Sequence, residues 1–263
     1  MARFLLTTLS SLAAALVVMG ITALVARRLG KVSVVDIAWG LVFVVIAWVC
    51  TFFSPGPRSL LLAVLVTVWG GRLAWHIRRR ALGAGEDPRY EKMLSAAPPE
   101  KRFAHAVRKV FVVQALAAYV ISLPIQVAAS ATGLHPLGWV AWVGVALFVV
   151  GVGFEAIGDA QLARFKSDPA NKGRIMDRGL WAWTRHPNYF GDAAVWWGLW
   201  IIAAEVWPAV LTVFSPMLMT YFLAFATGAR LLESEMAKRP GYPEYMQRTS
   251  MFLPLPPRRR SEG

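Results

Sequence analysis

Long uncharged runs separated by short clusters of charge constrain this chain more than any other feature of its sequence. The first run extends from Phe4 to Ala26 without a charged residue and stops at Arg27 and Arg28. About 20 residues of α-helix cross the hydrocarbon core of a bilayer, and further runs of this kind follow. With 57% hydrophobic residues, 16% charged residues and a mean hydropathy of +0.49, the composition is that of an integral membrane protein.

The pattern predicts an all-α membrane protein with seven transmembrane helices, formed by residues 1–263 as a single domain. The expected helices are approximately 4–26, 34–53, 59–77, 110–131, 137–163, 188–204 and 207–229, and residues 254–263 are expected to form a disordered tail. Lys and Arg collect in the loops assigned to the inside, whereas Arg58 alone lies in an outer turn. The positive-inside rule therefore predicts an N-terminus outside and a C-terminus in the cytoplasm.

The net charge of +13 is explained by the Lys and Arg residues that gather in the cytoplasmic loops of a membrane protein. No nucleic-acid partner is therefore expected. The single cysteine, Cys50, excludes an intrachain disulfide and a thiolate metal cluster. His76, His105 and His135 lack metal-ligand spacing, and no metal is expected. The basic loops are expected to contact membrane lipids, and no obligatory protein partner is predicted.

The most unusual polar stretch runs from Arg178 to Asp192, with the sequence RGLWAWTRHPNYFGD. Pro187 suits the first turn of a helix, whose free N–H groups and positive dipole end would lie beside Arg185. Such a helix start is a site for an anionic cofactor. A membrane-interface loop, with arginines on lipid phosphates and aromatic rings at headgroup level, is the alternative. Asn188 and Asp192, one helical turn apart, favour the cofactor site.

Three motifs resemble the C-terminal domain of the steroid 5α-reductase superfamily: RHPNYFGD at 185–192, LLESE at 231–235 and KRPGYPEY at 238–245. With DIAWG at 36–40 and EDPRY at 86–90, nearly the whole chain resembles a bacterial member of the branch described as a domain of unknown function. The resemblance implies a seven-helix enzyme of the bacterial inner membrane. It would hold NADPH in a cavity facing the cytoplasm and reduce the C=C bond of an α,β-unsaturated steroid or related lipid ketone.

The resemblance also implies a set of cofactor-binding residues: Arg78, Glu86, Asp87, Arg89, Tyr90, Glu155, Asp159, Lys166, Arg174, Arg185, His186, Asn188, Tyr189, Asp192 and Glu235. This set combines acidic groups that accept hydrogen bonds from ribose with arginines that bind phosphates. The sequence contains no G-x-G-x-x-G motif, which argues against a Rossmann domain.

Two positions correspond to the family's catalytic pair, a Glu and a Tyr that polarise the ketone oxygen. They are Asp36 and Trp75 in this chain. An indole N–H donates a hydrogen bond but does not transfer a proton as a phenol does. Asp36, protonated through burial, and Tyr90 are therefore the candidate proton donors. Arg72, at the membrane boundary, is the expected partner of Asp36. The candidate substrate-lining residues are Trp39, Phe43 and Trp75.

Two other functions stay open. An S-adenosylmethionine-dependent membrane methyltransferase, of isoprenylcysteine or lipid type, shares the Arg-His-Pro-x-Tyr motif and the paired glutamates Glu233 and Glu235. Those methyltransferases resemble the chain mainly in its C-terminal half, which favours the reductase. A non-catalytic lipid-binding membrane protein would hold no nucleotide and would be indifferent to neutralisation of Arg89 or Arg174.

Overall fold

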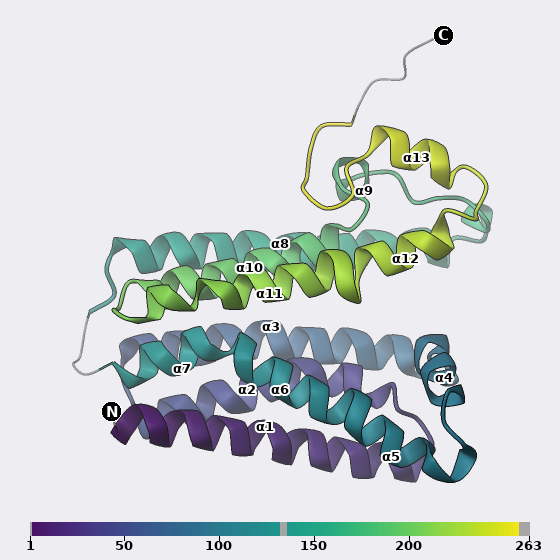
Figure 1. Cartoon of the computed structure of the whole chain (residues 1–263). Coiled ribbons are helices and arrows are strands. Elements are labelled where there is room, and N and C mark those ends of the chain that lie inside the picture. Colours follow the sequence, from purple (N-terminus) through teal and green to yellow (C-terminus); the bar gives the residue numbers. More distant parts are fainter. Residues whose placement is uncertain (1, 132–135, 258–263) are drawn as a thin grey trace. The chain divides into compact units, whose positions relative to one another are not determined.

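The computed structural model describes residues 2–131 and 136–257, and this part of the chain is helical with one isolated bridge between Thr184 and Ser250. Figure 1 shows the course of the helices. Among the described residues, six helical stretches are long and apolar enough to cross a membrane: Ala2–Leu29, Val34–Phe53, Pro57–Ala81, Pro99–Ile121, Trp139–Ser167 and Ala209–Met236. The prediction of an all-α protein is confirmed for this part of the chain, and the six apolar helices favour an integral membrane protein.

The other expected span, 188–204, corresponds to α10 (Pro187–Ala204), which is not among these six and carries Asn188 and Asp192 in its first turns. Most of the expected turn between the fourth and fifth spans, and residues 258–263 of the expected tail, lie outside the described residues.

The chain divides into two compact units. Unit 1 comprises Met1–Ala141 and Ile202–Ser215, and unit 2 comprises Trp142–Ile201 and Pro216–Gly263.

Unit 1 is built on α1 (Ala2–Leu29), α2 (Val34–Phe53) and α3 (Pro57–Ala81), with α2 packed against both of the others. The backbones of α2 and α3 meet where Gly40 faces Gly70. A Cβ on Gly70 would lie 2.5 Å from the Gly40 carbonyl oxygen, and a Cβ on Gly40 would lie 2.6 Å from that of Gly70. Only glycine permits this approach, as is common where membrane helices pack closely.

The rest of unit 1 consists of short elements: α4 (Pro88–Ser95), η1 (Pro99–Lys101), α5 (Arg102–Ala106), η2 (Val107–Phe111), α6 (Val112–Ile121), α7 (Leu123–Ser130) and η4 (Ala209–Val213). The helix expected at 110–131 therefore starts earlier and is interrupted at Ser122. Pro124 in the first turn of α7 explains the interruption, because proline lacks the N–H that would continue α6.

Unit 2 contains α8 (Trp139–Ser167), η3 (Pro169–Asn171), α9 (Leu180–Trp183), α10, α11 (Phe214–Tyr221), η5 (Phe222–Ala226), α12 (Ala229–Met236) and α13 (Tyr242–Arg248). The first residues of α8 and α11 and the last residues of α10 belong to unit 1. The helix expected at 137–163 extends further, to Ser167, and the helix start expected at Pro187 is confirmed. Gly151 of α8 and Gly191 of α10 meet closely, since a Cβ on either would lie 2.5 to 2.6 Å from the other's carbonyl oxygen.

Candidate functional site

The most organised polar site in unit 1 is the Asp36 cluster, which we define as Asp36, Glu86, Asp87, Arg89 and Tyr90. Asp36 lies in the first turn of α2, and the other four belong to the loop after α3 and the start of α4. The Tyr90 hydroxyl donates a hydrogen bond of 2.5 Å to Oδ1 of Asp36, and Nη2 of Arg89 donates one of 3.1 Å to Oδ2. Each oxygen of the Asp36 carboxylate thus has its own donor.

Asp87 fixes both the start of α4 and the guanidinium of Arg89. It is the N-cap of α4, and Oδ1 accepts a hydrogen bond of 2.9 Å from the Arg89 backbone N–H. The same carboxylate accepts hydrogen bonds from Nε and Nη2 of Arg89, each at 3.0 Å. These side-chain hydrogen bonds outweigh desolvation, so they lower the pKa of Asp87 and raise the pKa of Arg89. Both groups are therefore charged when Arg89 meets Asp36.

Glu86 joins this loop to the start of α2. Ser33 is the N-cap of α2, yet its side chain makes no capping bond. The Glu86 carboxylate caps the helix instead, because it accepts hydrogen bonds from the backbone N–H groups of Val32, Ser33 (3.0 Å) and Asp87 (2.9 Å). Burial opposes ionisation of Glu86, but the hydrogen bonds from Ser33 and these backbone groups lower its pKa below the usual value. The contacts of this expected cofactor residue are those of a helix cap.

Tyr90 is kept as a neutral phenol. Its pKa is raised, first by burial and then by the negative charge of Asp36. Because a neutral phenol is a hydrogen-bond donor and a proton source, the cluster presents an acid oriented by a carboxylate and flanked by a guanidinium.

The residues expected to line a substrate pocket have different surroundings. Phe43 is fully buried, edge-on to Trp39 at 5.0 Å and to Trp69 at 5.7 Å between ring centroids, and so fills the core around α2 and α3. Trp75 of α3 is 59% exposed. Arg78, an expected cofactor residue, is exposed in the last turn of α3.

In unit 2, the expected cofactor residues of α8 and α10 come together around the Gly151–Gly191 contact. Nδ2 of Asn188 donates a hydrogen bond of 3.4 Å to Oδ1 of Asp159, and Oδ1 of Asn188 accepts the Tyr189 backbone N–H at 3.1 Å. Two further carboxylates, Glu155 and Asp192, are 2% and 6% exposed. We call Glu155, Asp159, Asn188 and Asp192 the α8–α10 face. Its amide and carboxylates are suited to hydrogen-bonding hydroxyl and amide groups.

Two cations beyond this face are exposed: Lys166 at the end of α8 and Arg174 in the loop that follows η3. Sequence reasoning missed Gln161 of α8, whose Oε1 accepts the Leu180 backbone N–H at 3.0 Å and so holds the start of α9. Trp181 supports the same junction, because its Nε1 donates to the Gly158 carbonyl at 3.0 Å. No local pattern marks either contact.

Arg185 is the centre of a buried lock rather than of an open anion site. Its Nε and Nη2 donate to Oε1 and Oε2 of Glu233 at 2.5 and 3.0 Å. Nη1 donates to the carbonyls of Met246 (3.0 Å) and Thr249. His186 stacks on Tyr189 and lies 3.3 Å from Oε1 of Glu233 through Nε2. We call Arg185, His186 and Glu233 the tail lock.

Further hydrogen bonds join the end of the chain to the Arg178–Asp192 stretch. Figure 1 shows α13 beside α9, which belongs to this stretch. The Tyr245 hydroxyl donates to the Trp181 carbonyl at 2.5 Å, Thr184 Oγ1 donates to the Phe252 carbonyl at 2.9 Å, and the Leu255 N–H donates to the Trp183 carbonyl at 3.0 Å. Arg185, an expected cofactor residue, likewise donates its hydrogen bonds to groups of this fold, namely the Glu233 carboxylate and backbone carbonyls.

The two glutamates shared with the methyltransferase motif differ in their surroundings. Glu233 is buried in the tail lock, with a side chain 9% exposed. Glu235, an expected cofactor residue, pairs with Lys238 at 2.8 Å on the surface, where the two side chains are 73% and 69% exposed.

Comparison with known proteins assigns the family. The model for the family described as "Protein of unknown function (DUF1295)" matches residues 22–249, a range that includes the Asp36 cluster, the α8–α10 face and the tail lock. The chain belongs to this family. An uncharacterized protein of Schizosaccharomyces pombe is 25% identical to this DUF1295 protein, over 75% of this chain and 63% of the yeast protein. The chain thus spans less than two thirds of that relative's length. No solved structure matches it.

Proposed function

We propose that this DUF1295 protein is a membrane reductase that uses NADPH to reduce the C=C bond of an α,β-unsaturated lipid ketone, such as a 3-oxo-4-ene steroid. The observation that carries the proposal is the bond from Tyr90 to Asp36 beside Arg89. The motifs that resemble the steroid 5α-reductase superfamily support it. On the predicted topology, the site faces the cytoplasm.

The chemistry explains why this arrangement is suited to an enone. Hydride addition at the β-carbon places negative charge on the ketone oxygen, which needs a donor in the transition state. NADPH supplies the hydride when bound. Asp36 orients the phenol by accepting its single hydroxyl proton when no substrate is bound. With substrate bound, the hydroxyl would turn from Asp36 to the ketone oxygen and supply this proton, while Arg89 stabilises the enolate charge. Tyr90 thereby takes the role that the indole of Trp75 cannot perform, although it comes from α4 rather than α3.

The side chains of unit 2 fit a nucleotide in part. Lys166 and Arg174 are exposed cations suited to phosphates. Asp159 and Asn188 are half-buried and suited to hydroxyl and carboxamide groups. Arg185 does not fit, because its guanidinium is bonded to Glu233 and to backbone carbonyls. We therefore propose that the α8–α10 face, with Lys166 and Arg174, holds the cofactor.

The test uses the full chain purified in detergent, with NADPH that carries deuterium at its transferable position and a panel of enone lipids. The expected result is deuterium at the β-carbon of a saturated product. Tyr90→Phe should lower kcat by about 100-fold or more, the range of general acid catalysis. Tyr221→Phe, an exposed tyrosine of α11, is the matched control and should keep wild-type turnover. Failure of every enone to gain deuterium would reject the reductase, and wild-type turnover in a folded Tyr90→Phe variant would reject Tyr90 as the acid.

A further inference from the structure

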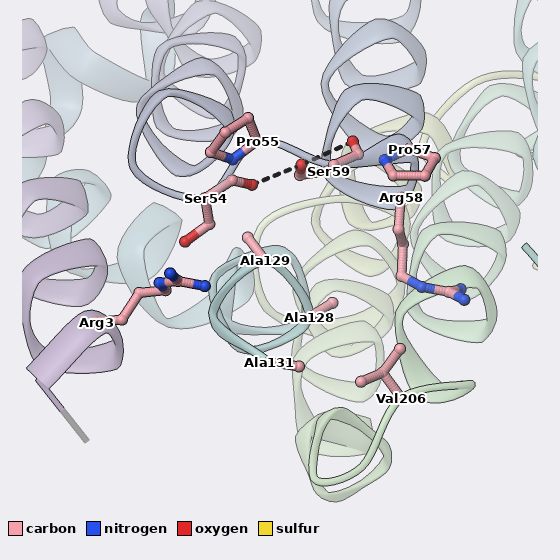
Figure 2. A pocket seen from close by; sticks show the side chains of 11 residues that line it. Arg3, Ser54, Pro55, Pro57, Arg58, Ser59, Ala128, Ala129, Ala131 and Val206 are labelled. Atoms are coloured by element: carbon pink, nitrogen blue, oxygen red, sulfur yellow. Dashed lines mark hydrogen bonds between the residues drawn. The ribbon is translucent and has the colours of Figure 1, made fainter. Parts of the chain in front are cut away.

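Unit 1 contains a cavity of about 160 Å³ at the end of the bundle where α1 begins, α2 ends and α3 begins. Asp36 lies at the opposite end of α2, so this cavity is separate from the Asp36 cluster. Its lining residues include Arg3, Ser54, Gly56, Arg58, Ser59 and Ala129, and Figure 2 shows the side chains around it. A water molecule takes about 30 Å³ of liquid volume, so the cavity has room for a small polyatomic group.

The lining of the cavity is cationic. Arg3 and Arg58 line it, and no Asp or Glu is among its described lining residues. Arg58 is 6% exposed and donates from Nη2 to Glu205 at 2.7 Å and from Nη1 to the Ile202 carbonyl at 2.6 Å. Glu205 lies behind Arg58 and also accepts the Gly138 N–H at 3.1 Å. The charge of Arg58 is therefore compensated, whereas no lining carboxylate compensates that of Arg3.

Two buried polar atoms at the cavity have no hydrogen-bond partner among the described residues. They are Oγ of Ser54 and Nε of Arg58, on residues that are 5% and 6% exposed. In Figure 2 the Ser54 side chain points toward the guanidinium of Arg3, while its carbonyl oxygen accepts Oγ of Ser59 at 2.8 Å. A buried polar group without a partner costs about 1 to 3 kcal/mol, so this site favours a ligand with several hydrogen-bond acceptors.

The backbone adds further donors. The cavity lies at the N-terminus of α3, a helix of 25 residues whose N-cap, Gly56, makes no side-chain cap bond. Pro57 has no N–H, but the N–H groups of Arg58 and Ser59 in the first turn have no acceptor within the helix, and the positive end of the helix dipole lies here. A helix start beside two arginines is an arrangement that binds phosphate.

We propose that this cavity binds a phosphate group, held by Arg3, the hydroxyl of Ser54 and the first turn of α3. The charge of the lining, its unpartnered buried donors and its volume all match a small tetrahedral oxyanion. On the predicted topology the site faces the outer leaflet, where a phospholipid headgroup or free phosphate can supply the group. The proposal is independent of the reductase activity.

The experiment measures Tm of the full chain in detergent during three titrations at equal ionic strength. The probes are dihexanoyl phosphatidylglycerol, inorganic phosphate, and dihexanoylglycerol as a neutral control for the acyl chains. The expected result is a saturable rise in Tm. A rise with the phospholipid alone identifies a headgroup site, and a rise with inorganic phosphate identifies a site for the free anion. A saturable rise with neither phosphate-containing probe, or an equal rise with the neutral lipid, would overturn the proposal.

Variants locate the binding site. Arg3→Gln and Ser54→Ala should each weaken the apparent affinity, Arg3→Gln by about tenfold because it removes a charge-assisted contact. Arg28→Gln is the control, since it removes an exposed cation at the other end of α1. Affinity that stays at the wild-type value in both Arg3→Gln and Ser54→Ala would also overturn the proposal.

Discussion

Arg185 and Glu233 form a two-point ion pair across 48 residues of sequence, with Nε to Oε1 at 2.5 Å and Nη2 to Oε2 at 3.0 Å, and their side chains are 7% and 9% exposed. The remaining nitrogen of Arg185 binds the carbonyls of Met246 and Thr249. One guanidinium therefore joins the approach to α10, the helix α12 and the end of α13.

Arg185→Ala should lower the free energy of unfolding by about 3 to 5 kcal/mol, because it leaves Glu233 buried without its cation. Arg185→Lys should be intermediate, since an ammonium keeps the charge but not the fork geometry. Thermal unfolding and the rate of trypsin cleavage in residues 242–257 measure the effect. Lys238→Ala, which removes an exposed pair with Glu235, is the control, and equal stability of Arg185→Ala and Lys238→Ala would refute the lock.

Gly70→Ala should destabilise unit 1 by about 1 to 3 kcal/mol, the usual cost of overpacking. Its Cβ would lie 2.5 Å from the Gly40 carbonyl oxygen, so the backbones of α2 and α3 would have to separate. Gly71→Ala is a matched control one residue along the same helix, since nothing lies within 4 Å of a Cβ there. We expect Gly71→Ala to melt at or slightly above the wild-type temperature. Equal melting of the two variants would contradict the close contact.

The stability of unit 2 should depend on the ionisation of Tyr242. Burial first, and then the charge of Glu233, raise the pKa of Tyr242 to about 12, compared with about 10 for an ordinary tyrosine. A raised folded-state pKa means that this contribution is complete below about pH 10 and is lost as the pH rises toward 12. Tyr242→Phe should therefore lose less Tm than the wild type between pH 9 and 11.5. Identical losses in the two proteins would show that Tyr242 does not contribute.

Glu86→Gln should weaken the start of α2 by about 1 kcal/mol, the usual value of a helix cap. Because the folded-state pKa of Glu86 is lowered, its contribution is present above the ordinary value of about 4.3 and is lost as the pH falls through the folded-state pKa. The variant should therefore show a flatter acid limb in a plot of Tm against pH. Glu100→Gln, an exposed glutamate of η1, should keep the wild-type limb.

The same variant separates the two roles considered for Glu86. If Glu86 is a cap, NADPH should bind to Glu86→Gln with unchanged affinity at pH 7. A clear loss of NADPH affinity with an unchanged acid limb would instead favour direct cofactor contact.

The long helices could be predicted from sequence because residues at their ends mark where they begin and stop. The range 34–53 expected for the second helix coincides with α2, since Ser33 and Ser54 bound an apolar run whose one charged residue is Asp36. Pro187 likewise marks the start of α10. The interruption at Ser122 was not predicted, although Pro124 supplies a local signal for it.

The partners of the polar residues could not be predicted in the same way. Arg72 was expected beside Asp36, and the printed sequence offers no reason to prefer Arg89, 53 residues away. That pairing depends on α4 folding back onto the start of α2, which the capping of Val32 and Ser33 by Glu86 stabilises. The partners of Arg185 could not be predicted either. It binds backbone carbonyls, and the path of the tail, not the identity of a side chain, determines which carbonyls lie within reach.

The most direct test of the reductase is mass spectrometry of the small molecules released from the full chain after purification in detergent, without and with prior incubation in NADPH. We expect stoichiometric NADPH or NADP, and a reduced amount in Arg174→Gln. S-adenosylmethionine or its demethylated product in place of a nicotinamide nucleotide would contradict the account, and so would a protein that retains no NADPH after incubation.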